Sequence, residues 1–324
     1  MNEIMNISGI ECFEKDGVTV LSLFDGISCG RIALERANIK VKKYYASEIK
    51  KIAIETTMFH YPDTIQIGDV TKVRYNNGVL YTEKGNFNVG KIDFLIGGSP
   101  CQDFSILRAT SGLEITGLEG TKSKLFYEYL RLLHEVKPQF FLLENVKMKK
   151  DSEQQLNDYL GVKGIFINSL LVSYQNRPRI YWTNIPNVTP PKDRNINFQD
   201  FREREYEKQL PYKVNRTPSR EKMWNNGHGR NQKGACANVT NSTHIQCITR
   251  KQDRFPNSGL VEFEDFCRYL TRSELELGQT LPAGYTDNLT YNQMQDVCGD
   301  CWTVDVIAHI FNFAKPYLPQ NYIL

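Results

Sequence analysis

The stretch GGSPCQDFS, residues 97–105, places a cysteine in an unusual setting. It follows the apolar run at residues 92–96, which is typical of a buried strand, and it combines two glycines and a Pro-Cys pair with polar residues. A lone cysteine is most often a small buried hydrophobic residue. These neighbours instead indicate an exposed loop, where a thiol can ionise and act as a nucleophile. We therefore interpret Cys101 as a candidate nucleophile.

A carboxyl group and two guanidinium groups occur in similar positions farther along the chain. Glu144 ends the apolar run at residues 140–143, and a carboxyl group in that setting is partly desolvated and suited to act as an acid. The alternative is an acid that caps a helix. The sequence QNRPR places Arg177 and Arg179 just before another apolar run. These side chains are candidates to act with the thiol.

Three more strand ends carry residues that suit an adenosine-containing ligand. FDGISCG, residues 24–30, supplies glycines that let backbone N–H groups approach a ligand. Glu48 follows Gly30 by 18 positions, a spacing that suits an acid bound to ribose hydroxyl groups, and Asp69 suits an adenine amino group. Structural turns or surface acids would explain each feature singly. Together, the three strand ends predict an adenosine site.

Strands and helices that would position these groups alternate along residues 1–185. A hairpin with its turn at Asn77-Gly78 interrupts the alternation, and helices return at residues 269–278 and 303–314. The pattern predicts an α/β fold with a mainly parallel, doubly wound sheet, whose ligands lie at the carboxyl ends of the strands. The predicted strands are residues 18–24, 43–47, 65–67, 92–96, 140–145, 165–171 and 179–182, and the predicted helices are residues 30–37, 50–60, 123–136 and 152–160.

The composition favours a globular protein over a disordered or membrane-spanning one. The 324 residues are 40% apolar and 24% charged, which is typical of a globular chain. No signal-peptide pattern and no apolar run long enough to cross a membrane occurs, so we expect an intracellular protein with reduced cysteines. The cysteines and histidine at positions 236, 244, 247, 298 and 301 could form a zinc site, but a second C-x-x-C pair is missing and we expect no metal.

These motifs, taken in order, resemble the cytosine-C5 DNA methyltransferase family, nearest the catalytic domain of the de novo DNA methyltransferases. The likeness spans nearly the whole chain. Two departures occur: Ser28-Cys29 replaces a common Gly-Gly, and Gly299-Asp300 replaces the usual Gly-Asn of the last motif. The stretches that carry the resemblance are FDGISCG, SPCQ, ENV, QNRPR, RYLTRSELELGQTLP and GDCWTVDVIAHIF.

The resemblance implies a Rossmann-like methyltransferase domain that uses S-adenosyl-L-methionine, with a small irregular target-recognition domain. It implies covalent catalysis by Cys101 on a flipped cytosine, assisted by Glu144, Arg177 and Arg179. The cofactor residues that it implies are Phe24, Asp25, Gly26, Ile27, Gly30, Glu48, Ile49, Asp69, Val70, Pro100, Leu125, Cys301, Trp302 and Thr303.

The resemblance also implies double-stranded DNA as the partner, with a cognate restriction endonuclease as a further candidate partner. We expect residues 1–185 to form the catalytic domain, residues 186–266 the basic target-recognition region, and residues 267–324 a return to the catalytic domain. Ser105, Arg250 and Lys251 are the candidate DNA contacts.

Two alternatives remain open. One is a tRNA-methylating enzyme, because Cys247-Ile248-Thr249 is similar to the Cys-Phe-Thr of that branch. The other is a DNA-binding relative without activity, against which the intact Cys101, Glu144 and Arg179 count. For the basic residues at 192–233, an ordinary solvated surface is the alternative to a nucleic-acid contact.

Overall fold

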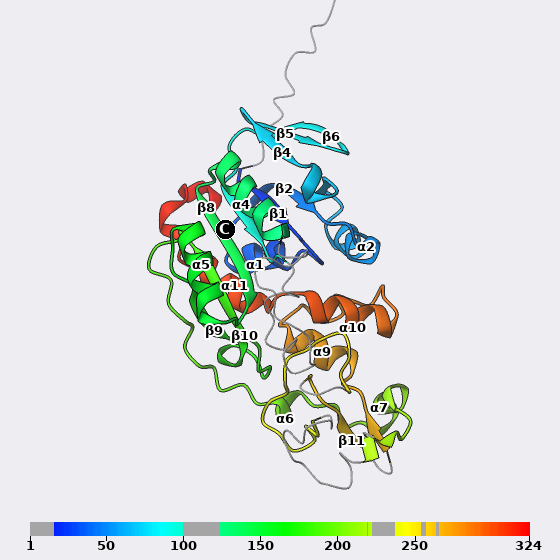
Figure 1. Ribbon diagram of the computed structural model, residues 1–324. Helices are drawn as coiled ribbons and strands as arrows, with labels where there is room; N and C mark the ends of the chain where they lie inside the picture. Colours follow the sequence, from blue (N-terminus) through cyan, green and yellow to red (C-terminus); the bar gives the residue numbers. More distant parts are fainter. Residues whose placement is uncertain (1–15, 100–123, 219, 222–236, 254–256, 264–265) are drawn as a thin grey trace, which may run out of the picture.

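A seven-stranded sheet forms the centre of the computed structural model, which describes residues 16–324 except 100–123, 219, 222–236, 254–256 and 264–265. The strand order is β3-β2-β1-β7-β8-β10-β9, and Figure 1 labels β1, β2, β8, β9 and β10 of this sheet. Neighbours from β3 to β8 are parallel, whereas β10 is antiparallel to β8 and β9, so the prediction of a mainly parallel sheet is confirmed. The strands are β1 (Val18–Leu23), β2 (Val41–Ser47), β3 (Ile65–Gln66), β7 (Phe94–Gly97), β8 (Phe140–Val146), β9 (Ile165–Asn168) and β10 (Pro178–Thr183).

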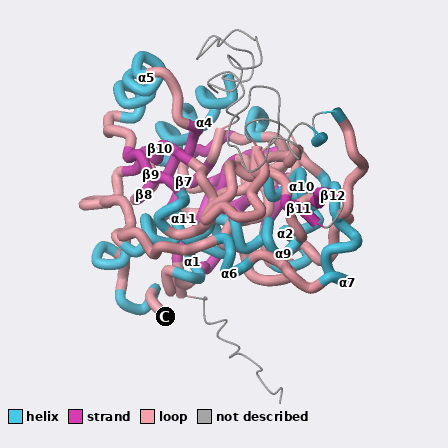
Figure 2. Tube along the Cα trace, turned by 90° about the horizontal axis from the view of Figure 1, so that it is seen from below, coloured by secondary structure: helices cyan, strands magenta, loops and turns pink. Residues whose placement is uncertain are grey.

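Helices cover both faces of this sheet. All six residues of β1 are buried, and Val20 and Leu21 belong to two different core clusters. Successive side chains of a strand point to opposite faces, so a strand that is buried throughout is covered on both sides. Figure 2 shows the strands between α4 and α5 on one side and α1 and α11 on the other. The helices are α1 (Cys29–Arg36), α2 (Lys51–His60), α4 (Lys124–Val136), α5 (Lys150–Leu160) and α11 (Val304–Asn312).

The predicted hairpin is part of a separate antiparallel sheet of three strands, β4 (Arg74–Asn76), β5 (Val79–Thr82) and β6 (Gly85–Asn88). Asn77 and Gly78 both have positive φ, 47° and 81°, as a two-residue hairpin turn of type I′ requires. The turn was therefore predicted correctly, and the third strand was missed. The backbone N–H of Tyr75 donates to Glu135 of α4 at 2.8 Å, which attaches this sheet to the main domain.

Two local predictions were wrong, and one helix was missed. The strand expected at residues 165–171 ends at Asn168, because the Asn168 side chain accepts the N–H of Leu170 and starts a 3-10 turn, Ser169–Leu171. The helix expected at residues 269–278 is α9 (Arg272–Gly278), because β12 (Phe266–Arg268) pairs with β11 (Val261–Phe263). Helix α10 (Tyr291–Asp300) was not predicted; its start is capped reciprocally by Thr290 and Gln293.

Among its described residues, the region at 186–266 contains only short elements, such as α6 (Phe198–Phe201) and α7 (Tyr206–Gln209). In Figure 1 it lies below α9 and α10, at the far end of the molecule from β4, β5 and β6. The α/β domain and the small irregular region thus match the expected fold class. Within the described ranges, no helix has both the length and the apolar character needed to cross a bilayer.

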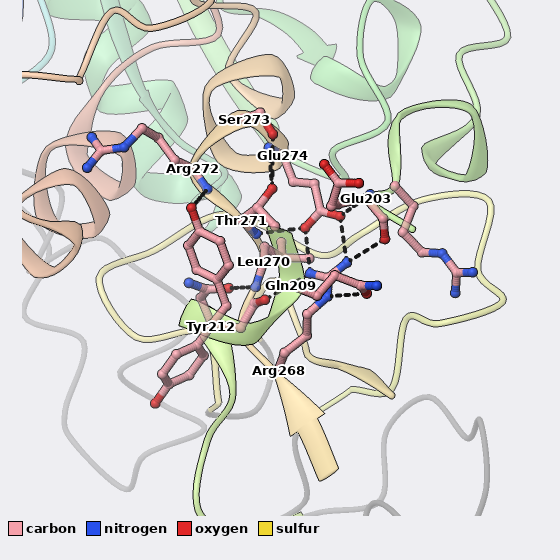
Figure 3. Close-up of polar contacts among 12 residues, drawn as sticks. Glu203, Gln209, Tyr212, Arg268, Leu270, Thr271, Arg272, Ser273 and Glu274 are labelled. Carbon is pink, nitrogen blue, oxygen red and sulfur yellow. Dashed lines mark hydrogen bonds and ion pairs between the residues drawn. The ribbon is translucent and has the colours of Figure 1, made fainter. Parts of the chain in front are cut away.

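A buried ion pair attaches this region to α9 (Figure 3). Arg268 and Glu274 are both fully buried and meet through two contacts of 2.8 Å. Arg268 also donates to the side chain of Gln209, at 2.9 Å, and to the carbonyl of Glu203, at 3.2 Å. Glu274 in turn accepts the N–H groups of Thr271 and Glu203. A buried pair is tolerated when its remaining donors and acceptors are satisfied in this way.

Removing one partner of this pair should be costly. We expect Glu274→Ala to lower the free energy of unfolding by about 3–5 kcal/mol, because the Arg268 guanidinium stays buried without its carboxylate. Glu55→Ala is the control: its exposed pair with Lys51, at 3.6 Å, should contribute less than about 0.5 kcal/mol. Urea unfolding followed by circular dichroism measures both. Equal losses in the two variants would contradict the role of the buried pair.

Candidate active site

A cavity of about 540 Å³ lies at the carboxyl ends of β1, β2, β7 and β8. Its volume is in the range of small-molecule sites. At one end it reaches the turns after β2 and β3, and at the other it reaches the end of β8. The sequence-predicted residues that line it are Phe24, Asp25, Gly26, Ile27, Glu48, Ile49, Asp69, Val70, Leu125, Glu144, Arg177, Arg179, Arg250, Cys301 and Trp302.

Asp25 organises the turn after β1. Its carboxylate accepts hydrogen bonds from the hydroxyl groups of Ser22 (2.6 Å), Ser28 (2.5 Å) and Tyr44 (2.7 Å). Burial raises the pKa of Asp25 to about 6, although these three hydrogen bonds oppose the increase. The Asp25 side chain therefore fixes the shape of the turn, and the neighbouring backbone is left to face the cavity.

Glu48 and Asp69 follow the neighbouring strands β2 and β3. One oxygen of Glu48 accepts the N–H of Gly26 at 2.9 Å, and the other accepts the N–H groups of Ile49 and Lys50 at 2.8 and 2.9 Å. A carboxylate has about four acceptor positions, so Glu48 retains capacity for a ligand hydroxyl group. Asp69 accepts the N–H of Thr71 at 2.9 Å. Two carboxylates thus face the cavity from adjacent strand ends.

Glu144 lies at the other end of the cavity, held by two donors. Arg179 Nε is 2.8 Å from one carboxylate oxygen, and Trp302 Nε1 is 3.0 Å from the other. The close packing of Trp302 and Glu144 against the backbone requires a glycine at position 98, because a Cβ there would lie 2.8 Å from the Trp302 nitrogen and 3.0 Å from Glu144. The next residue, Asn145, donates to Ser99 Oγ at 3.1 Å. The ENV motif thus anchors the segment that leads to Cys101.

The two arginines of QNRPR have different partners. Arg177 is 4% exposed and donates to the backbone carbonyls of Ile248, at 3.0 Å, and Cys301, at 2.8 Å. Arg179 donates to the Glu144 carboxylate instead. Cys247 lies beside both guanidinium groups, with its sulfur 3.4 Å from Arg177 and 3.8 Å from Arg179. Arg177 therefore fastens backbone segments around the cavity, whereas Arg179 acts directly on Glu144.

Some of the predicted residues do not line this cavity. A Cβ at Gly30 would lie 2.3 Å from Ile96, so this glycine permits close packing of α1 on the sheet. Thr303 is buried and hydrogen-bonded to Ser169 and Gln279. Lys251 is exposed outside the lining. Three predicted residues lie outside the described residues: Pro100, Cys101 and Ser105.

Two charged lining residues were missed by sequence reasoning, Lys50 and Asp300. Lys50 is two positions after Glu48, and Asp300 is the position at which the last motif departs from the family's asparagine. This departure was the feature of the sequence that could have drawn attention to Asp300. As for metals, the part of the chain that the structure describes contains no group of three or more His, Cys, Asp or Glu side chains placed to hold an ion. Cys236 falls outside that part.

Comparisons with known proteins agree with this geometry. Type II methyltransferase M.NgoBV of Neisseria gonorrhoeae is 31% identical over 188 residues, which cover 51% of this chain and 41% of that protein. Orphan methyltransferase M.Rho11sI of Bacillus phage rho11s is 31% identical over 175 residues, or 50% of this chain and 32% of that protein. The matched part thus spans well under half of each of these relatives.

Two solved structures share the fold over most of both chains. The Entamoeba histolytica methyltransferase EhMeth matches with a TM-score of 0.68 at 15% identity, covering 94% of this chain and all of that one. The S. pombe Dnmt2 methyltransferase matches with a TM-score of 0.62 at 16% identity, covering 93% of this chain and 99% of that one. The family model of the C-5 cytosine-specific DNA methylases matches residues 18–256. This match covers more than half of the chain and shows that the chain belongs to the C-5 cytosine-specific DNA methylase family.

Proposed function

We propose that the protein transfers a methyl group from S-adenosyl-L-methionine to C5 of a cytosine in double-stranded DNA. The observation that carries the proposal is the continuity of one cavity between two kinds of group. Glu48 and Asp69 suit an adenosine at one end, and Glu144 and Arg179 suit a base at the other. A methyl donor and its acceptor must meet in one space, and this cavity supplies it.

The lining fits the cofactor chemically. Carboxylates at adjacent strand ends suit the ribose hydroxyl and adenine amino groups. Apolar Phe24, Ile49 and Val70 also line the cavity and suit the faces of the purine ring. The bound cofactor would supply an electrophilic methyl group on a sulfonium centre. Phe24, Glu48, Asp69 and Trp302 are the residues that we assign to holding it.

The chain's own side chains prepare the cytosine. The Cys101 thiolate would add to C6 of the base, while Glu144 hydrogen-bonds or protonates N3, so that C5 gains enamine character and takes the methyl group. Loss of the C5 proton and then of the thiol would restore the aromatic ring. Arg179 fixes the Glu144 carboxylate at 2.8 Å and thereby its orientation toward N3. The base must leave the duplex to reach these groups, at a cost of a few kcal/mol.

Residues 186–266 are proposed to recognise the target, with basic side chains on phosphates and a few side chains on base edges. Arg250 has another partner in the structure, the Asp300 carboxylate at 2.6 Å. Its proposed role as a DNA contact therefore requires that this ion pair open. Lys251 is exposed and keeps its proposed role as a DNA contact.

The activity is tested directly with purified protein and labelled S-adenosylmethionine. We expect label in double-stranded DNA, at cytosines that bisulfite sequencing then identifies. Glu144→Gln should lower kcat by about 10²–10⁴-fold, because it removes an acid that acts in the reaction. Cys101→Ser should abolish transfer, because a hydroxyl group is a far weaker nucleophile.

Three outcomes would count against the proposal. Label in transfer RNA but not in DNA would favour the RNA alternative. Full activity of Cys101→Ser, or failure of 5-fluorocytosine DNA to trap the wild-type protein covalently, would exclude the covalent mechanism. No transfer to either nucleic acid would leave the non-enzymatic alternative.

Cofactor binding has its own test. Glu48→Gln should raise the dissociation constant for S-adenosylmethionine about ten- to a hundredfold, that is by about 1–3 kcal/mol, because a ribose hydroxyl group loses a charged acceptor. Glu55→Gln, on the exposed side of α2, is the matched control and should bind normally. Calorimetric titration measures both. Unchanged affinity of Glu48→Gln would remove Glu48 from the site.

The pair of arginines also predicts that the pKa of the Cys247 thiol lies below its usual value. Burial raises the pKa of Cys247, but the charges of Arg177 and Arg179 outweigh this effect and lower the pKa below its usual value. The thiolate should therefore persist to lower pH than an ordinary thiol. In a Cys101→Ser background, the rate of alkylation of Cys247 by iodoacetamide, measured by mass spectrometry, should reach half its maximum at a pH below that of an ordinary thiol.

Arg179→Met should move that midpoint to higher pH, because one of the two charges is gone. Arg194→Met, which removes a guanidinium group paired with Asp305, is the control and should leave the midpoint unchanged. The same midpoint in Arg179→Met and in the parent protein would show that Arg179 does not act on the thiol.

A further inference from the structure

Three charged side chains from distant parts of the chain meet at one rim of the cavity. Lys50 Nζ lies 2.5 Å from Asp300 Oδ2, and Arg250 Nη2 lies 2.6 Å from the same oxygen. Arg250 Nε also lies 3.3 Å from Asp300 Oδ1, so the guanidinium group contacts both carboxylate oxygens. All three residues line the cavity. We refer to Lys50, Arg250 and Asp300 as the Asp300 cluster.

The cluster connects the cofactor side of the cavity to the recognition region. Lys50 directly precedes α2, and its N–H donates to the carboxylate of Glu48, the acid that we assign to the ribose. Asp300 is the last residue of α10. Arg250 belongs to the region at residues 186–266. A single carboxylate therefore joins the turn that carries Glu48 to a segment of the recognition region.

Backbone packing keeps this segment close to α10. A Cβ at Gly299 would lie only 2.6 Å from the Arg250 nitrogen and 2.7 Å from the carbonyl carbon of Thr249, so the two backbones touch. Arg177 adds a second attachment through its hydrogen bonds to the carbonyls of Ile248 and Cys301. Small movements of residues 248–251 would therefore change the wall of the cavity itself.

The charges of the cluster explain why Asp300 affects the position of residues 249–251 more than the free energy of folding. The side chains of the cluster are 41–49% exposed, and ion pairs with such exposure add little to the free energy of folding. Burial raises the pKa of Asp300, but hydrogen bonds from Arg250 and Lys50 outweigh it and lower the pKa, so the carboxylate is charged. Without that charge, two cations would remain within about 5 Å of each other and repel.

We propose that Asp300 is a positioning residue that holds residues 249–251 against Lys50, so that cofactor affinity depends on the position of the recognition region. The inference rests on the proposed function, because it assigns the neighbouring acid Glu48 to the cofactor. Linkage makes the effect reciprocal: DNA that draws Arg250 away from Asp300 would change cofactor affinity, and bound cofactor would change DNA affinity by the same factor.

The test compares two aspartates that each accept two basic side chains. Asp300→Asn removes the charge of the cluster. Asp305→Asn is the matched control, because Asp305 pairs with Arg36 and Arg194, both at 2.5 Å, and does not line the cavity. We expect Asp300→Asn to raise the dissociation constant for S-adenosylhomocysteine about tenfold in calorimetric titrations, and Asp305→Asn to change it less than twofold.

Two further measurements separate positioning from stability. In methylation assays at saturating cofactor, Asp300→Asn should keep kcat within about twofold of the wild type while the KM for S-adenosylmethionine rises. Asp300→Glu, which restores the charge, should recover most of the affinity. High salt should weaken cofactor binding by the wild type and have less effect on Asp300→Asn, because the cluster is partly exposed to ions.

Unchanged affinity of Asp300→Asn, or equal losses in both aspartate variants, would overturn the proposal. A wild-type protein that binds no S-adenosylhomocysteine would instead overturn the proposed function. In that case hydrogen exchange still tests whether Asp300 holds residues 249–251 in place, because the measurement needs no ligand. Peptides covering residues 246–252 should exchange faster in Asp300→Asn than in Asp305→Asn. The same exchange in both would exclude a positioning role for Asp300.

Discussion

The buried guanidinium group of Arg177 is the constraint on which the rest of the site depends. It lies at the start of β10, next to Pro178, and it binds carbonyl groups from two segments that are far apart in the sequence. One segment belongs to the irregular region and the other follows α10. A cation that is almost fully buried must find such partners, because an unpaired charge there would be very costly. Meeting this requirement brings the walls of the cavity together.

The divided roles of Arg177 and Arg179 follow from β-strand geometry. Arg177 directly precedes β10 and Arg179 is its second residue. Residues two apart along extended backbone point to the same side, and both guanidinium groups contact the sulfur of Cys247. Arg177 lies where backbone carbonyls converge, whereas Arg179 lies opposite Val146 of β8 and next to Glu144. A single short motif thus supplies one group that shapes the cavity and another that orients a carboxylate within it.

The sequence predicted the sheet and much of the cavity for physical reasons. Glu48, Asp69 and Glu144 each lie at or just after the end of a predicted strand, and the ends of parallel strands meet at one edge, so their order along the chain was enough to place them together. It did not predict α10, whose apolar residues are few and whose start is set by a polar cap. Nor did it predict the Arg250–Asp300 contact, because a pairing between the end of a helix and an irregular segment 50 positions away leaves no periodic signal.

The packing of α11 against α1 has a consequence for how the chain folds during its synthesis. Helix α1 ends at Arg36 and α11 begins at Val304, so the helix that packs on the apolar face of α1 is synthesised about 270 residues later. At roughly 5–20 residues per second, a ribosome needs about 15–50 s to make that stretch. During this interval the Ile32 and Leu34 side chains and one face of β1 stay uncovered by α11. The nascent chain therefore exposes an apolar surface that a chaperone could cover until α11 has left the exit tunnel.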